Sequence, residues 1–158
     1  MGNRRDGKEA VGVIEEAFRE LAERFETSAC FRWFGFRFAE FREGSAVLEL
    51  ELREELLNLS RVLHGGVSAA MLDTVMGLAV RSVTRQIPLT INLDVRYFRP
   101  VFEGTVRAAG KVVHHGNSIA TAEAELLQGG VLMAKATGTF SLAKARAQQE
   151  QGQGEPHG

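Results

Sequence analysis

The sequence has little of several features that would place it in a common class of protein. It contains one cysteine, Cys30, and therefore no internal disulfide or cysteine-based zinc site, which is typical of a reducing compartment. Its 19 Lys and Arg residues nearly balance 20 Asp and Glu residues, for a net charge of −1. This balance argues against binding to nucleic acid or to an anionic membrane. No apolar run typical of a secretory signal follows Met1, and Asp6 stands where a myristoylation signal needs Ser or Thr. We expect a soluble, cytoplasmic protein.

The composition that remains is that of one ordinary globular domain. The chain has 158 residues, of which 44% are hydrophobic and 25% charged, enough to bury a single substantial core. The sequence predicts three parts: an N-terminal segment over residues 1–29 that carries an amphipathic helix, a main domain over 30–142, and a tail over 143–158. The tail is rich in Gln and Gly and is expected to be disordered.

The main domain has the patterning of an α+β protein. Apolar residues recur at steps of three and four over residues 8–25, which predicts the amphipathic helix. Runs with alternating apolar and polar residues predict a largely antiparallel sheet of about six strands. The expected strands cover residues 31–41, 46–53, 89–98, 105–114, 118–127 and 131–142.

A very apolar stretch, residues 62–80, lies between the second and third of these strands. It predicts a helix from about Gly66 to Val83 that packs against one face of the sheet. Asp73 in its middle and the nearby His64 make membrane insertion unfavourable. A helix that is apolar on all sides is buried on all sides. We therefore expect a second subunit to cover the side that faces away from the sheet.

Asp73 is the one formally charged residue in this stretch. Burial of a carboxylate is costly, so its pKa should rise unless partners hold the charge. Asp73 lies about seven residues past Gly66, too deep in the helix to cap its first turn. Two interpretations stay open: a carboxylate that takes part in chemistry, and a buried Asp that is satisfied by the backbone and by hydroxyls such as Thr74.

The tripeptide His64-Gly65-Gly66 stands at the predicted start of that helix. Free amides at a helix start suit an oxyanion or a polarised carbonyl, although a glycine pair can also simply make a turn. Gly65 and Asp73 are eight residues apart, which is roughly 12 Å along one helix, so they cannot act on one atom within a chain. Two helices that run antiparallel across a two-fold axis could bring Gly65 of one chain to Asp73 of the other.

Other catalytic classes are poorly supported. His114 and His115 are adjacent on a strand and point to opposite faces, so they cannot chelate one ion, and we expect no metal site. The sequence has no G-x-S-x-G motif of the kind found in α/β-hydrolases.

The order of elements and several motifs together resemble the hotdog-fold acyl-CoA thioesterases of the phenylacetate-degradation (PaaI-like) type. The resemblance covers about residues 30–142 and rests on Asn58, His64-Gly65-Gly66, Leu72-Asp73, Gly77, Asn92–Pro100, His115–Ser118 and Ala134–Phe140. It implies a hotdog fold, in which the sheet wraps around a long central helix. It also implies a homodimer at least, and we expect a homotetramer.

The resemblance further implies that the chain hydrolyses an acyl-CoA thioester to a carboxylic acid and free coenzyme A, without a separate cofactor. Asp73 matches the catalytic carboxylate, and Gly65 the glycine whose amide polarises the thioester carbonyl. Asn58, His64 and Thr90 match polar residues near the thioester or the attacking water. Arg61 departs from the pattern, since many members have glycine there. Contacts with coenzyme A are implied for Tyr97, Arg99, His114, His115, Gly116, Asn117 and Ser118, with Arg96 and Lys111 as further candidates for its phosphates.

Two alternative functions stay open. A hotdog hydratase or dehydratase also uses a carboxylate on the central helix but pairs it with a catalytic histidine, for which His64 is the candidate. The other alternative is a non-catalytic acyl-CoA-binding protein. Such a protein commonly carries a DNA-binding segment, whereas residues 8–25 form one acidic helix with no partner helix.

Overall fold

The computed structural model describes residues 13–143 of the chain. Seven strands form one sheet in the order β1-β2-β3-β5-β6-β7-β4, in which every pairing is antiparallel except that of β1 with β2. The strands are β1 (Val13–Ile14), β2 (Arg37–Arg42), β3 (Ser45–Glu51), β4 (Ile87–Tyr97), β5 (Thr105–His115), β6 (Ile119–Gln128) and β7 (Val131–Ala143). The helices are α1 (Arg19–Glu26), α2 (Ala29–Phe34) and α3 (Gly65–Thr84), with short 3-10 turns at Glu16–Phe18 and Glu54–Leu56.

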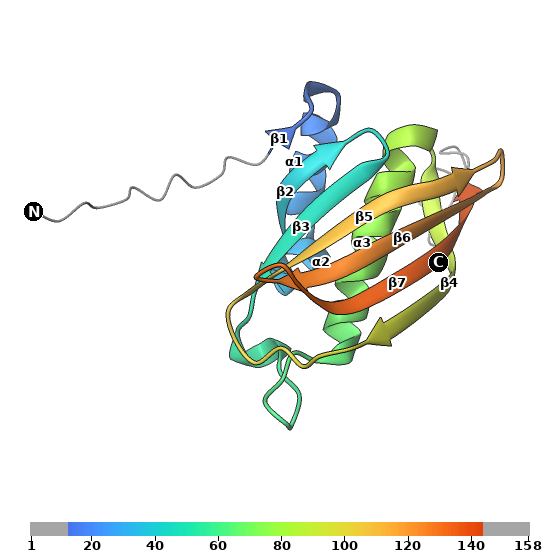
Figure 1. The fold of residues 1–158 in the computed structure, drawn as a ribbon. Helices are drawn as coiled ribbons and strands as arrows, with labels where there is room; N and C mark the ends of the chain where they lie inside the picture. Colours follow the sequence, from blue (N-terminus) through green and yellow to red (C-terminus); the bar gives the residue numbers. More distant parts are fainter. Residues whose placement is uncertain (1–12, 144–158) are drawn as a thin grey trace, which may run out of the picture.

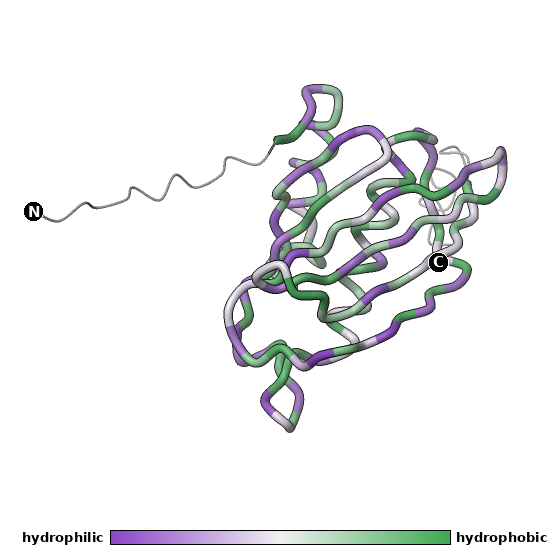
Figure 2. The backbone as a smooth tube through the Cα atoms, viewed as in Figure 1, coloured by the Kyte–Doolittle hydropathy of each residue, from purple (hydrophilic) through white to green (hydrophobic). Residues whose placement is uncertain are grey.

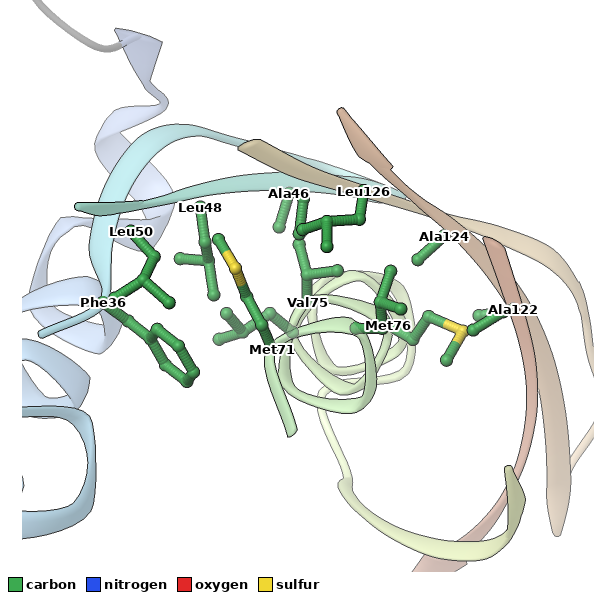
Figure 3. Packing of buried hydrophobic residues seen from close by; sticks show 14 of the residues in the cluster. Phe36, Ala46, Leu48, Leu50, Met71, Val75, Met76, Ala122, Ala124 and Leu126 are labelled. Carbon is green, nitrogen blue, oxygen red and sulfur yellow. The ribbon is translucent and has the colours of Figure 1, made fainter. Parts of the chain in front are cut away.

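The sheet curves around α3, which crosses its concave face (Figure 1). The apolar segments of the chain run through this central region (Figure 2). Met71, Val75 and Met76 of α3 are fully buried and interdigitate with inward side chains of β3 and β6, including Leu48 and Leu126 (Figure 3). The fold is thus the expected α+β arrangement of a largely antiparallel sheet around a long central helix.

Gly110 of β5 allows α3 to lie this close to the sheet. A Cβ atom at Gly110 would stand 2.8 Å from the carbonyl oxygen of Val75, a distance at which either the helix or the strand would have to move. The close approach anchors the middle of α3, near Asp73, against the centre of the sheet.

α3 is long and apolar enough to cross a membrane by length and composition alone. More than half of its apolar window is buried inside the domain, against β3, β5 and β6, as expected for the core helix of a folded domain. Its remaining side is only half-buried and carries small or polar residues, namely Ala69, Ala70, Asp73, Thr74, Gly77 and Arg81. The helix is therefore not covered all round within one chain.

The expectation of a continuous helix over residues 8–25 is wrong for the described part; residues 8–12 lie outside the described residues. Val13 and Ile14 instead form β1 beside Glu40 and Phe41, and the α-helix begins only at Arg19. The pairing with β2 overrides the local helical pattern. It also adds the seventh strand to the six that were expected.

The expectation of an extended segment over residues 31–41 is wrong in its first half. Residues up to Phe34 belong to α2, which ends at Gly35 in the left-handed conformation (φ 82°). The ring of Phe31 packs on those of Phe36 and Phe38 with centroids 5.5 Å apart. Phe34 thus belongs to a helix, although its spacing from Phe36 and Phe38 suggested a strand.

The other strand predictions agree with the structure to within two residues at each end, and the predicted helix 66–83 is one residue short at each end. The turns at Gly44 and at Gly129-Gly130 are confirmed, with φ of 79°, 54° and 80°. The tail from residue 144 onward lies outside the described residues.

Candidate active site

The amide of Gly65 is the free hydrogen-bond donor at the start of α3. His64 occupies the N-cap, where its Nδ1 accepts from the amide of Gly66 at 2.9 Å and its carbonyl accepts from Val67 and Ser68. Gly65 N–H has no acceptor among residues 13–143. The helix start therefore presents one unoccupied amide with the positive end of the helix dipole behind it.

The hydroxyl of Tyr97, at the end of β4, donates to the carbonyl oxygen of Gly65 at 2.6 Å. Its ring stands 3.4 Å from the position that a Cβ on Gly65 would occupy, so a side chain there would press on the ring. Burial raises the pKa of Tyr97, which keeps the hydroxyl protonated as a donor. Tyr97 was expected to contact coenzyme A, and within one chain its hydroxyl is bonded to Gly65 instead.

Asp73 lies in the middle of α3 on the half-buried side. Its Oδ1 accepts a hydrogen bond from the Thr90 hydroxyl of β4 at 2.9 Å. Burial raises the pKa of Asp73 above its usual value, and the bond from Thr90 partly counteracts this rise. The carboxylate is thus held by one hydroxyl, that of Thr90, and not by Thr74, whose hydroxyl donates to the carbonyl of Ala70.

A bulge in β4 lies next to the contact between Thr90 and Asp73. The pairing of β4 with β7 shifts register between Thr90 and Asn92, so that Thr90 pairs with Phe140 and Leu93 with Gly138, both inward positions. Thr90 therefore shares the helix-facing side with Leu93. The strict alternation read from the sequence had placed these two residues on opposite faces, and the extra residue of the bulge corrects that assignment.

Asn58 and Arg61 lie in a projecting hairpin just before α3. The side-chain oxygen of Asn58 accepts from the amides of Ser60 and Val62 at 2.9 and 3.3 Å, which leaves the Asn58 amide group as its free end. Arg61 has φ 60°, the left-handed conformation that glycine adopts at least cost, and pairs with Glu54 at 2.7 Å. The main chain at position 61 therefore has the left-handed conformation that glycine favours, although the residue is an arginine.

The residues expected to contact coenzyme A fall into two groups at opposite ends of β4. Tyr97 and Arg99 lie beside Gly65, and Arg99 donates to the carbonyl of Leu132 at 2.9 Å. The second group, His114–Ser118, forms the exposed connection between β5 and β6, near the Leu89 end of β4. Eight residues of strand separate the two ends, about 26 Å, so one chain does not bring the groups together.

A cavity of about 330 Å³ opens beside Gly65, and it was not foreseen from the sequence. Its walls are mostly apolar and include Ser68 of α3, which follows Gly65 by one helical turn, an (i, i+3) spacing that could have indicated a shared surface. The remaining principal wall residues are Val62, Tyr97, Phe98, Val101 and Met133. Asp73 does not line this cavity.

The described part of the chain offers no cluster of metal ligands. Over residues 13–143, no three His, Cys, Asp or Glu side chains are placed so as to hold one metal ion. His114 and His115 are exposed at the end of β5.

Comparisons with known proteins agree with this fold. A sequence profile described as the Thioesterase superfamily matches residues 61–134, which include Gly65, Asp73 and Tyr97. A solved protein from the thioesterase superfamily is 34% identical to this chain, covers 78% of it and is itself covered over 97% of its length, with a TM-score of 0.73. A variant of the phenylacetic acid degradation protein PaaI from Thermus thermophilus is 28% identical over 73% of this chain and 100% of its own, with a TM-score of 0.70.

Among curated proteins, one from Saccharolobus solfataricus that is provisionally named an esterase is 27% identical to this chain. The match covers 89% of this chain and 98% of that protein. The chain is a hotdog-fold protein of the thioester hydrolase class. It belongs to the thioesterase superfamily and is PaaI-like within it.

Proposed function

We propose that the protein hydrolyses an acyl-CoA thioester, as a dimer in which Asp73 of one subunit works with Gly65 of the partner subunit. The observation that carries this proposal is the free Gly65 amide at the start of the same helix that holds Asp73 in its middle. The two groups are roughly 12 Å apart along one helix, whereas groups that act on one carbonyl must meet within about 3–3.5 Å. A second chain supplies the missing half of each site.

A single two-fold axis would bring Gly65 of one chain to Asp73 of the other. The same axis would bring Tyr97 and Arg99 to residues 114–118 of the other chain. β4 is the edge strand of the sheet beyond β7, and it is mostly exposed, with Leu89 and Ile91 about half open to solvent. If two β4 strands paired antiparallel, the Tyr97 end of one would meet the Leu89 end of the other. The same pairing would bring residues 114–118 of the partner toward Tyr97 and Arg99. It would also cover the open side of α3 between Gly65 and Asp73, while the C-terminal end of the helix stays outside this contact.

The proposed reaction needs only groups on the protein and water. The Gly65 amide of one chain polarises the thioester carbonyl and stabilises the negative oxygen of the tetrahedral state, a contribution of about 2.7–4 kcal/mol in comparable sites. Asp73 either attacks the carbonyl carbon or takes a proton from the attacking water. In either case the carbon–sulfur bond breaks and coenzyme A leaves as the thiol. When water attacks, the acyl group leaves directly as a carboxylic acid. When Asp73 attacks, the acyl group stays on its carboxylate as a mixed anhydride, which water then hydrolyses to the carboxylic acid and free Asp73. Coenzyme A belongs to the substrate, and no other cofactor takes part.

The remaining predicted residues take supporting roles in this proposal. Thr90 holds the Asp73 carboxylate and His64 caps the helix start. Asn58 lines the same surface pocket as His64. The apolar cavity beside Gly65 receives an apolar acyl group. Tyr97 and Arg99, with residues 114–118 of the partner, line the path of coenzyme A. We also propose that two dimers assemble into a tetramer and that the protein is cytoplasmic.

The experiment that tests this function has two steps. The first is a thiol-release assay over a panel of aliphatic and aromatic acyl-CoAs, and hydrolysis of at least one is expected. The second mixes two inactive variants, Asp73→Asn and Gly65→Val, after co-refolding. Heterodimers should regain one good site each, since one subunit supplies the carboxylate and the other the amide. Heterodimers that form but stay inactive would contradict the shared site.

The hydratase alternative depends on His64 acting as an acid or base. Nδ1 of this side chain is already engaged with the Gly66 amide at 2.9 Å, which leaves Nε2 as its free nitrogen. A change in double-bond absorbance with no thiol release would favour this alternative. Saturable acyl-CoA binding with neither reaction would favour the non-catalytic acyl-CoA-binding protein.

A further inference from the structure

Three arginines converge on one surface pocket at the C-terminal end of α3, the end opposite Gly65. Arg24 comes from the last turn of α1, Arg81 from the last turn of α3, and Arg85 from the residue that caps α3. The pocket has a volume of about 240 Å³. Gly65 and Arg81 are sixteen residues apart, roughly 24 Å along the helix, so within one chain this pocket is remote from the helix start.

None of the three guanidinium groups has a carboxylate within 4.0 Å or a hydrogen bond to the rest of residues 13–143. Other arginines on this domain, such as Arg42, Arg61 and Arg107, do have such carboxylate partners. Burial and the neighbouring Arg24 lower the pKa of Arg81, which means that its charge is poorly compensated where it lies.

Charge near the pocket favours an anion even after the negative groups are included. Glu20 lines the pocket and contributes one negative charge, and the C-terminal dipole ends of α1 and α3 contribute about half a charge each. Three guanidinium charges against roughly two negative ones leave the pocket positive by about one charge. Helix dipoles alone explain why a cation stands at a helix end, but not why three of them share one cavity.

One of the three arginines is also held in place. The guanidinium of Arg85 lies over the buried ring of Phe18, 4.8 Å from its centroid, and the residue has φ 57°. A stacked guanidinium keeps its edge free to donate hydrogen bonds and has less freedom to lose when a ligand binds. Arg24 and Arg81 approach the same space from two different helices.

We propose that Arg24, Arg81 and Arg85 form a binding site for a phosphate group. The planar fork of each arginine matches phosphate oxygens, and several forks on one cavity favour a multiply charged tetrahedral anion over a single carboxylate. The cavity has room for a phosphate and a small substituent. The phosphate can come from free inorganic phosphate or from a phosphorylated nucleotide such as coenzyme A, and the test separates these sources.

The test is titration of the full chain with inorganic phosphate at constant ionic strength, by calorimetry and by thermal unfolding. We expect a saturable response in the wild type, and binding weakened by at least about tenfold in both Arg24→Gln and Arg81→Gln. Arg42→Gln removes an exposed arginine of β2 outside the pocket and is the matched control; it should bind phosphate like the wild type. If Arg81→Gln does not fold, phosphate binding by Arg24→Gln alone tests the proposal. Arg24 is exposed on α1, so its substitution should leave the fold intact.

A charge reversal sharpens the test. Arg24→Glu should abolish the phosphate response and raise the unfolding temperature without phosphate, because it replaces a repulsive neighbour of Arg81 with an attractive one. No saturable phosphate response in the wild type, or an equal response in all variants, would overturn the proposal. An equal response would reflect the general stabilising effect of phosphate as a salt.

Competition then identifies the source of the phosphate. Coenzyme A that displaces inorganic phosphate, when 3′-dephospho-coenzyme A does not, would assign the site to the 3′-phosphate of the nucleotide. Failure of both to displace it would assign the site to free phosphate. The readout is binding, so its outcome does not depend on whether the proposed hydrolysis occurs.

Discussion

The hydroxyl of Tyr97 donates a 2.6 Å hydrogen bond to the carbonyl oxygen of Gly65, and this bond ties the end of β4 to the first residue of α3. The amide and carbonyl of Gly65 thus have different tasks. The carbonyl anchors the helix start to the sheet, while the amide stays free to meet a substrate. Positioning of the free amide therefore depends on a side chain 32 residues further along the chain.

Tyr97→Phe removes this bond and keeps the ring. We expect a loss of stability of about 1 kcal/mol, the usual net value of one hydrogen bond, and a fall in kcat larger than any change in KM, because the amide that serves the transition state becomes less fixed. Chemical denaturation and steady-state thiol release measure the two effects. An unchanged kcat would show that the bond has no positioning role.

Thr90→Val removes the hydrogen bond that lowers the pKa of Asp73. The acid should then ionise at higher pH than in the wild type. Because the proposed reaction needs the carboxylate, the acidic limb of the pH–rate profile should move to higher pH. Thr90→Ser retains the hydroxyl and is the control, which should keep the wild-type profile. A limb that moves to lower pH, or stays in place, would contradict the role given to Thr90.

Asp73→Asn should abolish thiol release and stabilise the fold at neutral pH. Burial raises the pKa of Asp73 in the folded protein above its ordinary value of 3.8, so the folded state favours the protonated acid. Stability from this group is complete below pH 3.8 and is lost as the pH rises through the folded-state pKa. The variant should gain up to about 1 kcal/mol at neutral pH, a small figure because the carboxyl is only half-buried.

The same comparison made at low pH is the internal control. The stability difference between Asp73→Asn and the wild type should shrink as the pH falls toward 3.8. Asp94→Asn serves as a second control, since Asp94 is exposed beside Arg96 and lies on the other face of β4. A variant that is less stable than the wild type at neutral pH would show that the ionised Asp73 contributes to folding.

His64→Ala removes the acceptor that caps the Gly66 amide, at a cost of about 1 kcal/mol. His64→Asn supplies another good N-cap acceptor and should recover most of that stability. We also expect the asparagine variant to retain most thiol release, because the proposed hydrolysis needs no acid or base at this position. Full stability with loss of thiol release in His64→Asn would instead give the imidazole a chemical role in the hydrolysis.

The centre of the fold could be predicted from the sequence because its signals are local. The apolar stretch with Asp73 in it forms α3 within one residue of the expected bounds, and strong alternation located five of the strands. The pair Gly65 and Asp73 was found because a charge in an apolar helix and glycines at its start are both visible in sequence. The resemblance to PaaI-like thioesterases rested on the same segment, and the comparisons confirm it.

The parts that could not be predicted depend on contacts between distant residues. Val13 and Ile14 leave the helical pattern because β2 offers them backbone partners. Phe34 lies in a helix because Phe31 packs on Phe36 and Phe38 across the turn at Gly35. Neither the cavity beside Gly65 nor the convergence of three arginines follows from spacing, since their residues come from separate elements.

The irregularity between Thr90 and Asn92 leaves one residue of β4, Ile91, without a partner on β7. Deletion of Ile91 would leave a continuous ladder with β7 in which Thr90 still pairs with Phe140, so its hydroxyl would stay on the side that faces α3. The contact between Thr90 and Asp73 thus depends on which residue of β7 stands opposite Thr90, and not on the number of residues in β4. Natural variation in this region could therefore include loss of the unpaired residue without loss of this contact.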